Sequence, residues 1–313
     1  MRLKTLKDFG AFAADKNNFE QIGDYILFSL RMLEYLAIRD NQEIITAINE
    51  PNYKMIQFQK EGKFKITRPY NENVLYSFTD ADDSYPTFQT YLKGLRDHRK
   101  EAIIADCSVI NRTIYTLQQS LGFALDAGTA LGVNSNIARK VAGDLFERLI
   151  ILVLNEIGLK CKSGTVMVPL VVRGKTLGRM SFQQDLIIMS PEDHLKVIGS
   201  VKTTSKDRMA KVFIDKLLYC KLTDTQIPHI AVFLHDVQSA NGKNLDKPKI
   251  SETFLSGHFK GYTIKLNPLD GVYYCDLRPK MKTDPMLKKR IQSLDMLFCK
   301  DIWNLLDAEQ GPI

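Results

Sequence analysis

The sequence predicts an α/β fold with a mainly helical N-terminal part. The chain has 313 residues, of which 44% are hydrophobic, so it can bury one large core or two smaller ones. Apolar residues recur at helical spacing in the first part, whereas helical patterns and strand-like runs alternate in the second. Residues 128–135 form the expected boundary, which gives predicted domains at residues 1–130 and 131–313.

The N-terminal part is expected to contain two helices, a hairpin and a loop. The helices are predicted at residues 19–39 and 100–126. Residues 53–68 alternate like a hairpin that turns at Glu61-Gly62. Residues 71–86 are polar and acidic, which predicts a loop whose acids are more typical of solvated turns than of a metal site.

The second part is expected to begin with a helix from Ser135 to about Ile157, which Gly158 ends. Strands are then predicted at residues 180–189 and 194–202, joined by a turn at residues 190–193. A helix from about Lys206, capped by Thr203, Thr204 or Ser205, follows them. The remaining predictions are a buried central strand at residues 227–235, a strand pair at 262–266 and 272–277, and a last helix through Trp303.

The stretch between Asp185 and Asp215 combines two carboxylates with Ser200, Lys202 and a charged triplet at 206–208. Because the two predicted strands are joined by a tight turn, we expect Asp185 and Lys202 to lie close together although seventeen positions separate them. Arg208 and Asp215 are seven residues apart, about two helical turns, so both project from roughly the same side of the next helix.

These residue types fit phosphodiester hydrolysis. Mg²⁺ prefers oxygen ligands, which Asp185 and Asp215 can supply, and a cation such as Lys202 can orient or activate the attacking water. Ser200, two residues earlier on the same strand face, can hydrogen-bond a metal-bound water. Taken singly, an Asp on a strand is more often a solvated edge residue, and a Lys at a strand end is usually an exposed surface residue without a catalytic role. The combination is what favours a nuclease site.

In order and spacing, these residues resemble the PD-(D/E)xK nuclease superfamily, and more narrowly the type II restriction endonucleases that read CCGG, CCNGG or CCWGG. Asp185, Ser200, Lys202 and Asp215 match the catalytic positions, and Lys206, Asp207 and Arg208 match the triplet that in the family contacts the outer C:G pairs. The triplet occupies the fourth to sixth positions after the lysine and the acid the thirteenth, as in the CCNGG/CCWGG branch. The resemblance covers about residues 140–220.

The resemblance implies a PD-(D/E)xK restriction-endonuclease-like core, with a mixed central sheet flanked by helices. It also implies Mg²⁺ as cofactor, double-stranded DNA as substrate and a homodimer that reads a palindromic site. The N-terminal helices are then candidates for the dimer interface or for a DNA-clasping arm. Three residues depart from the family pattern: Gln184 replaces the nominal proline, Asp215 stands where glutamate is usual, and Lys206 replaces the first arginine.

Glu147 is a further candidate for the metal site. It shares a helical stripe with Gly143 and Ile150, and in the superfamily a helix acid before the catalytic strands often lies near the metal or its waters. A salt bridge to Arg139, Lys140 or Arg148 is an equally good reading of the same carboxylate.

Charge and cysteine content agree with an intracellular DNA-binding protein. The net charge is +7, with six basic residues against two acids in 196–216 and six against Asp284 in 278–290. Five scattered cysteines without a CxxC pair are typical of free thiols in a reducing cytoplasm, and no segment approaches the length of a membrane span. The alternatives that remain open are a repair or structure-specific nuclease with the same core and a non-catalytic DNA-binding protein.

Overall fold

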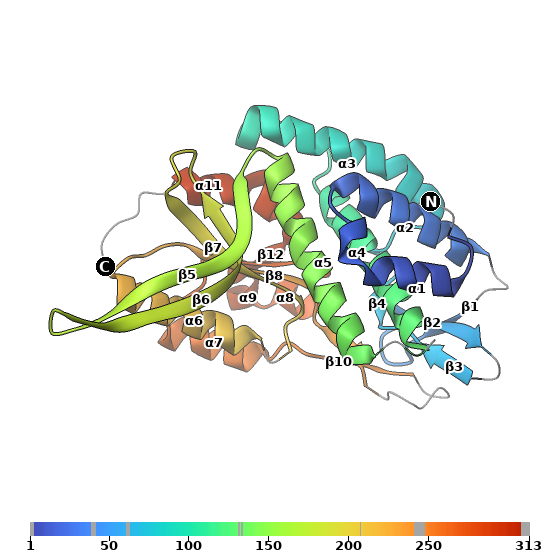
Figure 1. The fold of residues 1–313 in the computed structure, drawn as a ribbon. Coiled ribbons are helices and arrows are strands. Elements are labelled where there is room, and N and C mark those ends of the chain that lie inside the picture. The colour runs from blue at the N-terminus through green and yellow to red at the C-terminus, as the bar shows by residue number, and fades with distance from the viewer. Residues whose placement is uncertain are drawn as a thin grey trace. The chain divides into compact units, whose positions relative to one another are not determined.

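The computed structural model describes residues 3–38, 42–60, 63–130, 132, 134–206, 208–240 and 248–307 (Figure 1). By internal contacts the chain groups into two compact units, each built from separate segments. Unit 1 comprises Met1–Tyr91, Ser108–Leu149 and Val237–Thr253; unit 2 comprises Leu92–Cys107, Ile150–Asp236 and Phe254–Ile313. Whether residues 1–130 and 131–313 fold as separate domains stays a prediction.

Unit 1 combines long helices with a small antiparallel sheet. Helices α1 (Leu6–Ala14) and α2 (Ile22–Ala37) pack on α4 (Ser108–Ala130), with Phe9, Phe19 and Phe28 fully buried between them. The sheet contains β1 (Gln42–Thr46), β2 (Tyr53–Lys60), β3 (Lys63–Ile66) and β4 (Tyr70–Asn71), and a second strand pair contains β9 (Val237–Ser239) and β10 (Ile250–Glu252). The antiparallel pairing of β2 and β3 confirms the predicted hairpin; its turn at Glu61-Gly62 lies outside the described residues.

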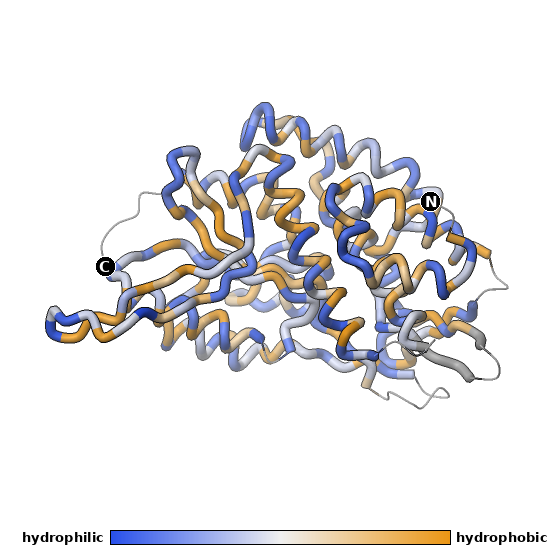
Figure 2. The backbone as a smooth tube through the Cα atoms, in the orientation of Figure 1, coloured by the Kyte–Doolittle hydropathy of each residue, from blue (hydrophilic) through white to orange (hydrophobic). Residues whose placement is uncertain are grey.

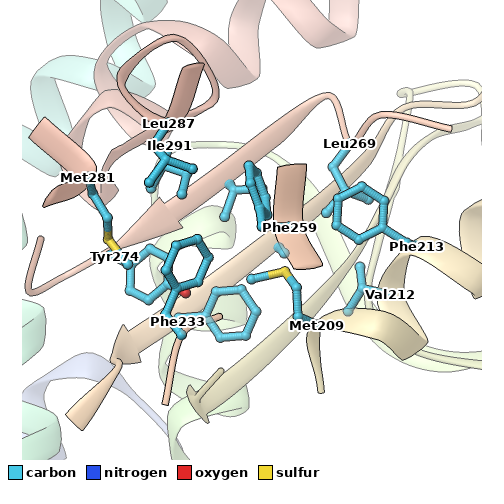
Figure 3. Packing of buried hydrophobic residues seen from close by; sticks show 13 residues of the cluster. Met209, Val212, Phe213, Phe233, Phe259, Leu269, Tyr274, Met281, Leu287 and Ile291 are labelled. Atoms are coloured by element: carbon cyan, nitrogen blue, oxygen red, sulfur yellow. The ribbon is translucent and has the colours of Figure 1, made fainter. Parts of the chain in front are cut away.

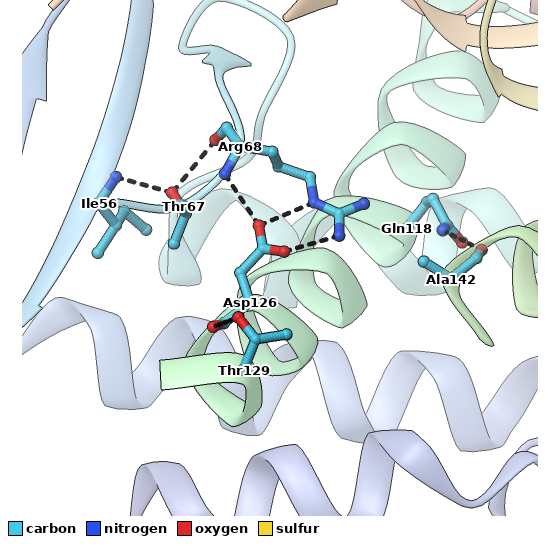
Figure 4. Close-up of polar contacts among 7 residues, drawn as sticks. All are labelled: Ile56, Thr67, Arg68, Gln118, Asp126, Thr129 and Ala142. Atoms are coloured by element: carbon cyan, nitrogen blue, oxygen red, sulfur yellow. Dashed lines mark hydrogen bonds and ion pairs between the residues drawn. The ribbon is translucent and has the colours of Figure 1, made fainter. Parts of the chain in front are cut away.

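Polar contacts join the chain after β3 to α4 (Figure 4). Arg68 donates from its backbone N and from Nε to Oδ2 of Asp126, each at 2.9 Å, and from Nη2 to Oδ1 at 2.9 Å. Gln118, two turns before Asp126 in α4, donates to the carbonyl of Ala142 in α5 (Ser135–Glu156) at 2.8 Å. Two-point guanidinium–carboxylate contacts fix orientation as well as distance, so they hold this loop in one geometry.

Unit 2 contains a six-stranded mixed sheet flanked by helices, as predicted. The strand order is β12-β11-β8-β7-β6-β5, in which β12, β11, β8 and β7 run parallel and β6 and β5 pair antiparallel. The bounds are β5 (Lys160–Val172), β6 (Lys175–Met189), β7 (Leu195–Thr204), β8 (His229–His235), β11 (Gly271–Tyr274) and β12 (Ile291–Ser293). Every residue of β8 is buried, which confirms the predicted central strand.

Helices cover both faces of this sheet. On one face, α6 (Met209–Thr223) and α7 (Ser256–Lys265) pack through Phe213 and Phe259, whose rings lie 5.7 Å apart, onto Phe233 of β8 (Figure 3). On the other, the hydroxyl of Tyr273 in β11 donates to Asp301 at 3.0 Å, in the C-terminal helical segment. That segment contains α10 (Leu294–Met296), the π-helical Leu297–Asp301 and α11 (Ile302–Asp307); α8 (Pro279–Thr283) and α9 (Pro285–Arg290) precede it.

Several predicted helices are confirmed with shifted bounds. Helix α2 (Ile22–Ala37) confirms the helix predicted at 19–39. Helix α5 ends before Gly158, whose φ of +88° is the left-handed geometry that ends a helix. Helix α4 starts at Ser108 instead of residue 100. Arg99–Glu101, where the helix was expected to begin, form a separate 3-10 turn. Helix α6 starts at Met209 with Arg208 as its N-cap, since β7 continues through Thr204; the predicted caps Thr203, Thr204 and Ser205 are wrong.

Two predictions of element type are wrong. Much of the expected loop at 71–86 belongs to α3 (Phe78–His98), which contains Pro86 and buries a helical stripe of Ala81, Tyr85 and Phe88. The buried residues at helical spacing stabilise the helix, although the acids between them are typical of turns. Residues 262–266, expected to form a strand, lie at the end of α7 and directly after it, where Phe259 and Thr263 recur at helical spacing on the buried side.

Candidate active site

The predicted hairpin brings Asp185 and Lys202 into contact. Strands β6 and β7 pair in the register Leu186↔Gly199 and Ile187↔Ile198, with the turn closed by a hydrogen bond from Ser190 N to His194 O at 2.7 Å. Lys202 Nζ forms an ion pair with Oδ2 of Asp185, and the same oxygen accepts from Val201 N at 2.8 Å. The Asp185 side chain is 13% exposed and that of Lys202 33% exposed, so the pair lies at the edge of solvent.

A β-bulge places Asp185 where two strands separate. On β5 the pairing steps from Lys162 to Gly164, while on β6 it steps from Ile187 to Gln184, so β6 carries one extra residue at this point. Pairing of β6 with β7 begins only at Leu186. Bulges bend a strand and re-aim a side chain, and here the carboxylate of Asp185 turns toward the backbone and the ammonium of β7.

Ser200 and Lys202 share one face of β7, because side chains two positions apart project to the same side. Parallel pairing sets Ser200 beside Ala231 and Lys202 beside Phe233 on β8. Ala231 and Phe233 pack against α6, so Ser200 and Lys202 belong to the sheet face that α6 covers.

Asp215 lies on α6, the helix that covers this face. Tyr219, one turn later, packs on Phe182 of β6 with ring centroids 5.8 Å apart, and Leu222 packs in the same cluster. Asp215 therefore projects from the flank of α6 that is turned toward β5 and β6. Its side chain is 20% exposed and forms an ion pair with Lys211.

The predicted base-reading residues lie at the start of α6. Lys206 and Arg208 are exposed, and Arg208 is the N-cap residue of the helix, while Asp207 lies outside the described residues. Lys206 follows the end of β7 by two residues, so the triplet occupies the connection between the strand that carries Lys202 and the helix that carries Asp215.

Glu147 is half-buried on α5 and belongs to unit 1, whereas the strands of the site belong to unit 2. Of its predicted salt-bridge partners, Lys140 pairs with Asp144, and Arg148 donates to the carbonyl of Lys16 at 2.6 Å. The role of Glu147 beside a metal stays a proposal.

The two site carboxylates have the chemistry that Mg²⁺ requires. Both described hydrogen bonds of Asp185 reach Oδ2, so Oδ1 is the oxygen that can face a cation, and Asp215 supplies a second carboxylate. Within the described part of the chain, no group of three or more His, Cys, Asp or Glu side chains could hold a metal ion. Mg²⁺ commonly keeps several waters and is bound through one or two carboxylates, so this donor set fits it.

Two cations that the sequence assigned to basic DNA-facing clusters are buried in the fold. Lys216 has a side chain 4% exposed and bonds to Asp270 at 2.7 Å, and Arg278, 5% exposed, lies 3.7 Å from Asp236. Their partners are distant in sequence, which is why the composition of the local segment did not reveal them. The phosphate-facing charge of these clusters is correspondingly smaller than predicted.

His229 is a buried residue of β8. Its Nδ1 donates to the carbonyl of Ile227 at 2.8 Å, and its ring lies 5.5 Å from that of Tyr219. Burial lowers the pKa of His229 to about 3, so the ring is neutral at pH 7.

No protein-family model matches the chain, and no curated protein matches it. Among solved structures, that of the Type IIP restriction endonuclease Kpn2I is similar, with a TM-score of 0.68 and 18% sequence identity over 96% of this chain and 97% of the other. A complex of the restriction endonuclease PspGI with substrate DNA is matched with a TM-score of 0.41 and 13% identity, over 72% of this chain and 91% of that one. The chain therefore has the fold of a restriction endonuclease, on the evidence of the first structure. No helix in the described ranges is both long and apolar enough to cross a membrane.

Proposed function

We propose that the chain is a type II restriction endonuclease that makes Mg²⁺-dependent double-strand cuts at a short palindromic DNA site with a CC(N)GG-like core. The contact between Asp185 and Lys202 at the point where β6 and β7 separate carries this proposal. It occurs in a chain with the fold of a restriction endonuclease, and the helix that covers the same sheet face bears Asp215.

The residues of the site divide the chemistry between them. Asp185 and Asp215 would hold Mg²⁺, which supplies Lewis acidity and lowers the pKa of a bound water when it is present. Lys202 Nζ, which lies against Oδ2 of Asp185, can donate to the attacking water and to the phosphate oxygen. Ser200 on the same strand face can orient that water through its hydroxyl.

Specificity is assigned to Lys206, Asp207 and Arg208. An arginine can donate two hydrogen bonds to O6 and N7 of one guanine, whereas a lysine donates as a point charge and an aspartate can accept from cytosine N4. The exposed position of Arg208 at the start of α6 supports this assignment, because the N-terminal end of the helix also attracts phosphate. The spacing between Lys202 and the triplet favours an interrupted CC(N)GG-like core.

Replacing Lys202 by alanine tests the proposal. We expect Lys202→Ala to abolish cleavage in Mg²⁺ while DNA binding, measured by fluorescence anisotropy without metal, stays within a few-fold of wild type. Lys265→Ala removes the same charge from the exposed end of α7 and should cut normally. A fully active Lys202→Ala protein would exclude this site. Fragment ends from wild type that share no common sequence would indicate a structure-specific nuclease instead.

A further inference from the structure

Strands β5 and β6 continue beyond the sheet as a two-stranded arm. Strand β6 pairs with β7 only from Leu186 onward, whereas its pairing with β5 extends from Met189 to Lys175. Residues 164–184 therefore form a ribbon that starts beside Asp185 and extends away from the other strands of the sheet (Figure 1).

The arm has a defined shape. Val168 and Phe182 at its base are buried against Tyr219 of α6. At its tip, Val172 pairs with Lys175 across a two-residue turn in which Arg173 and Gly174 have φ of +50° and +77°. Positive φ at both central residues is the geometry of a tight hairpin turn that matches strand twist. The arm is thus an ordered ribbon anchored at the active-site end.

The charged residues of the arm are all basic. Residues 164–184 contain Arg173, Lys175 and Arg179 and no acid, a net charge of +3, and Lys160 and Lys162 precede the arm on β5. Lys160 pairs with Asp193, whereas the three distal cations are exposed and have no ion pair within the described part of the chain. These three solvated cations lie on both faces of the ribbon, because the register shift between Leu170 and Val171 changes the side-chain alternation between Arg179 and Lys175. With no acid among residues 164–184, they offer positive charge to an anion.

Exposed apolar side chains accompany these cations. Val171, Val172 and Leu177 are 54%, 53% and 70% exposed, and the hydropathy of the ribbon alternates along its length (Figure 2). A second copy of the arm is a poor partner for this surface, because a symmetric contact would bring like charges together. DNA can contact both kinds of side chain, because its phosphates are anionic and its major groove also presents the apolar methyl groups of thymine.

We propose that this arm binds the DNA duplex beside the cleavage site, with Arg173, Lys175 and Arg179 on phosphates; this inference rests on the proposed function. A two-stranded ribbon fits the major groove of B-DNA. Eight residues of β5, 165–172, span about 26 Å at about 3.3 Å per residue, so the arm reaches over about eight base pairs from the site. It is then a contact to flanking DNA and does not take part in bond cleavage.

The salt dependence of DNA binding tests the arm without knowledge of the recognition sequence. We compare wild type with the variant Arg173→Asn/Lys175→Gln/Arg179→Gln on a random-sequence duplex of about 30 base pairs, without divalent metal. Asn suits the positive φ at position 173. The slope of log K against log salt is negative, and each lost phosphate contact reduces its magnitude by about 0.9. Its magnitude should therefore be smaller by about 2.7 in the triple variant than in wild type. Between about 50 and 200 mM salt, wild type should lose about 40-fold more affinity than the variant.

A charge-matched control separates the arm from net charge. Lys93, Lys265 and Lys300 are exposed on α3, α7 and the C-terminal helical segment, and replacing all three by Gln removes the same charge. The control should keep the wild-type slope, and the single variant Arg179→Gln should lower it by about 0.9.

The possible results distinguish DNA binding by the arm from an effect of net charge and from binding of a second copy. A wild-type slope in the arm variant overturns the proposal, as does an equal fall in the control. A change of oligomeric mass in the arm variant at unchanged slope would identify a second copy as the partner and also overturn it. Wild type that binds DNA but does not cut it in Mg²⁺ would refute the proposed function alone, because the slope comparison remains readable.

Discussion

The carboxylate of Asp185 both accepts a backbone hydrogen bond and faces the site, and these two roles can be separated. We expect Asp185→Asn to abolish Mg²⁺-dependent cleavage, because the amide loses the charge that a metal needs but keeps an oxygen for Val201 N. Cleavage assays and calorimetric Mg²⁺ titration check this, with thermal unfolding as the control for folding. Normal cleavage by Asp185→Asn would show that the metal is held elsewhere.

Arg208 is expected to contribute to sequence recognition. Removing its guanidinium in Arg208→Ala should weaken specific binding by about 1–3 kcal/mol and reduce discrimination against a changed outer C:G pair. Lys221→Ala, an exposed cation at the other end of α6, is the matched control and should bind normally. Equal weakening on cognate and scrambled duplexes would mean that Arg208 contacts only phosphate.

At the scale of elements, the site depends on the close approach of three strands at Gly199. A Cβ at this position would lie 2.8 Å from Ile230 Cγ1 and 3.2 Å from both Ile230 O and Leu186 Cδ1. We expect Gly199→Ala to lower the free energy of unfolding by about 1–3 kcal/mol through overpacking, measured by urea denaturation. Gly143 lies within α5, and a Cβ there would meet no described atom within 4 Å apart from the backbone of its own helix, so Gly143→Ala should be neutral or stabilising. A neutral Gly199→Ala would show that the strands can shift at little cost.

The buried His229 predicts how stability depends on pH. Its folded pKa of about 3 lies below its ordinary value of 6.5, so its contribution is fully present above pH 6.5 and is lost as the pH falls toward 3. Each pH unit in that window costs about 1.4 kcal/mol. Between pH 7.5 and 5.5, wild type should therefore lose about 1.4 kcal/mol more than His229→Asn. Parallel pH profiles of urea midpoints for the two proteins would contradict this.

How far the elements and the site could be predicted depends on whether the signal is local. The turn at 190–193 and the flanking apolar runs are local, and they predicted the strands that join Asp185 to Lys202. The helix α3 was missed because acids and Pro86 dominate its composition, although its buried stripe keeps helical spacing. The burial of Lys216 depends on Asp270, 54 residues away, so nothing near Lys216 in the sequence indicates it.

The β5–β6 arm was also missed. Its distal cations were not singled out because no strand was predicted at 160–172, so the antiparallel pairing that gathers Arg173, Lys175 and Arg179 on one ribbon could not be inferred. The signal that existed was the lack of acids from 160 to 184. A stretch of like charges can be assigned to a binding surface only when its structure is known.

For the whole molecule, the proposed palindromic target predicts a C2 homodimer. Two equivalent readers and two active sites are needed to cut both strands at equivalent positions. Light scattering at assay concentration should give the mass of two chains of 35.7 kDa each, with or without DNA. A stable monomer that cuts both strands in one binding event would contradict this assembly.

Site-specific cleavage of DNA is tested by incubating the protein with unmethylated phage DNA in Mg²⁺ and sequencing the fragment ends. We expect discrete ends at one palindrome with a CC(N)GG-like core, and no such ends with Lys202→Ala. Uncut DNA across several divalent metals, or ends at unrelated sequences, would contradict it.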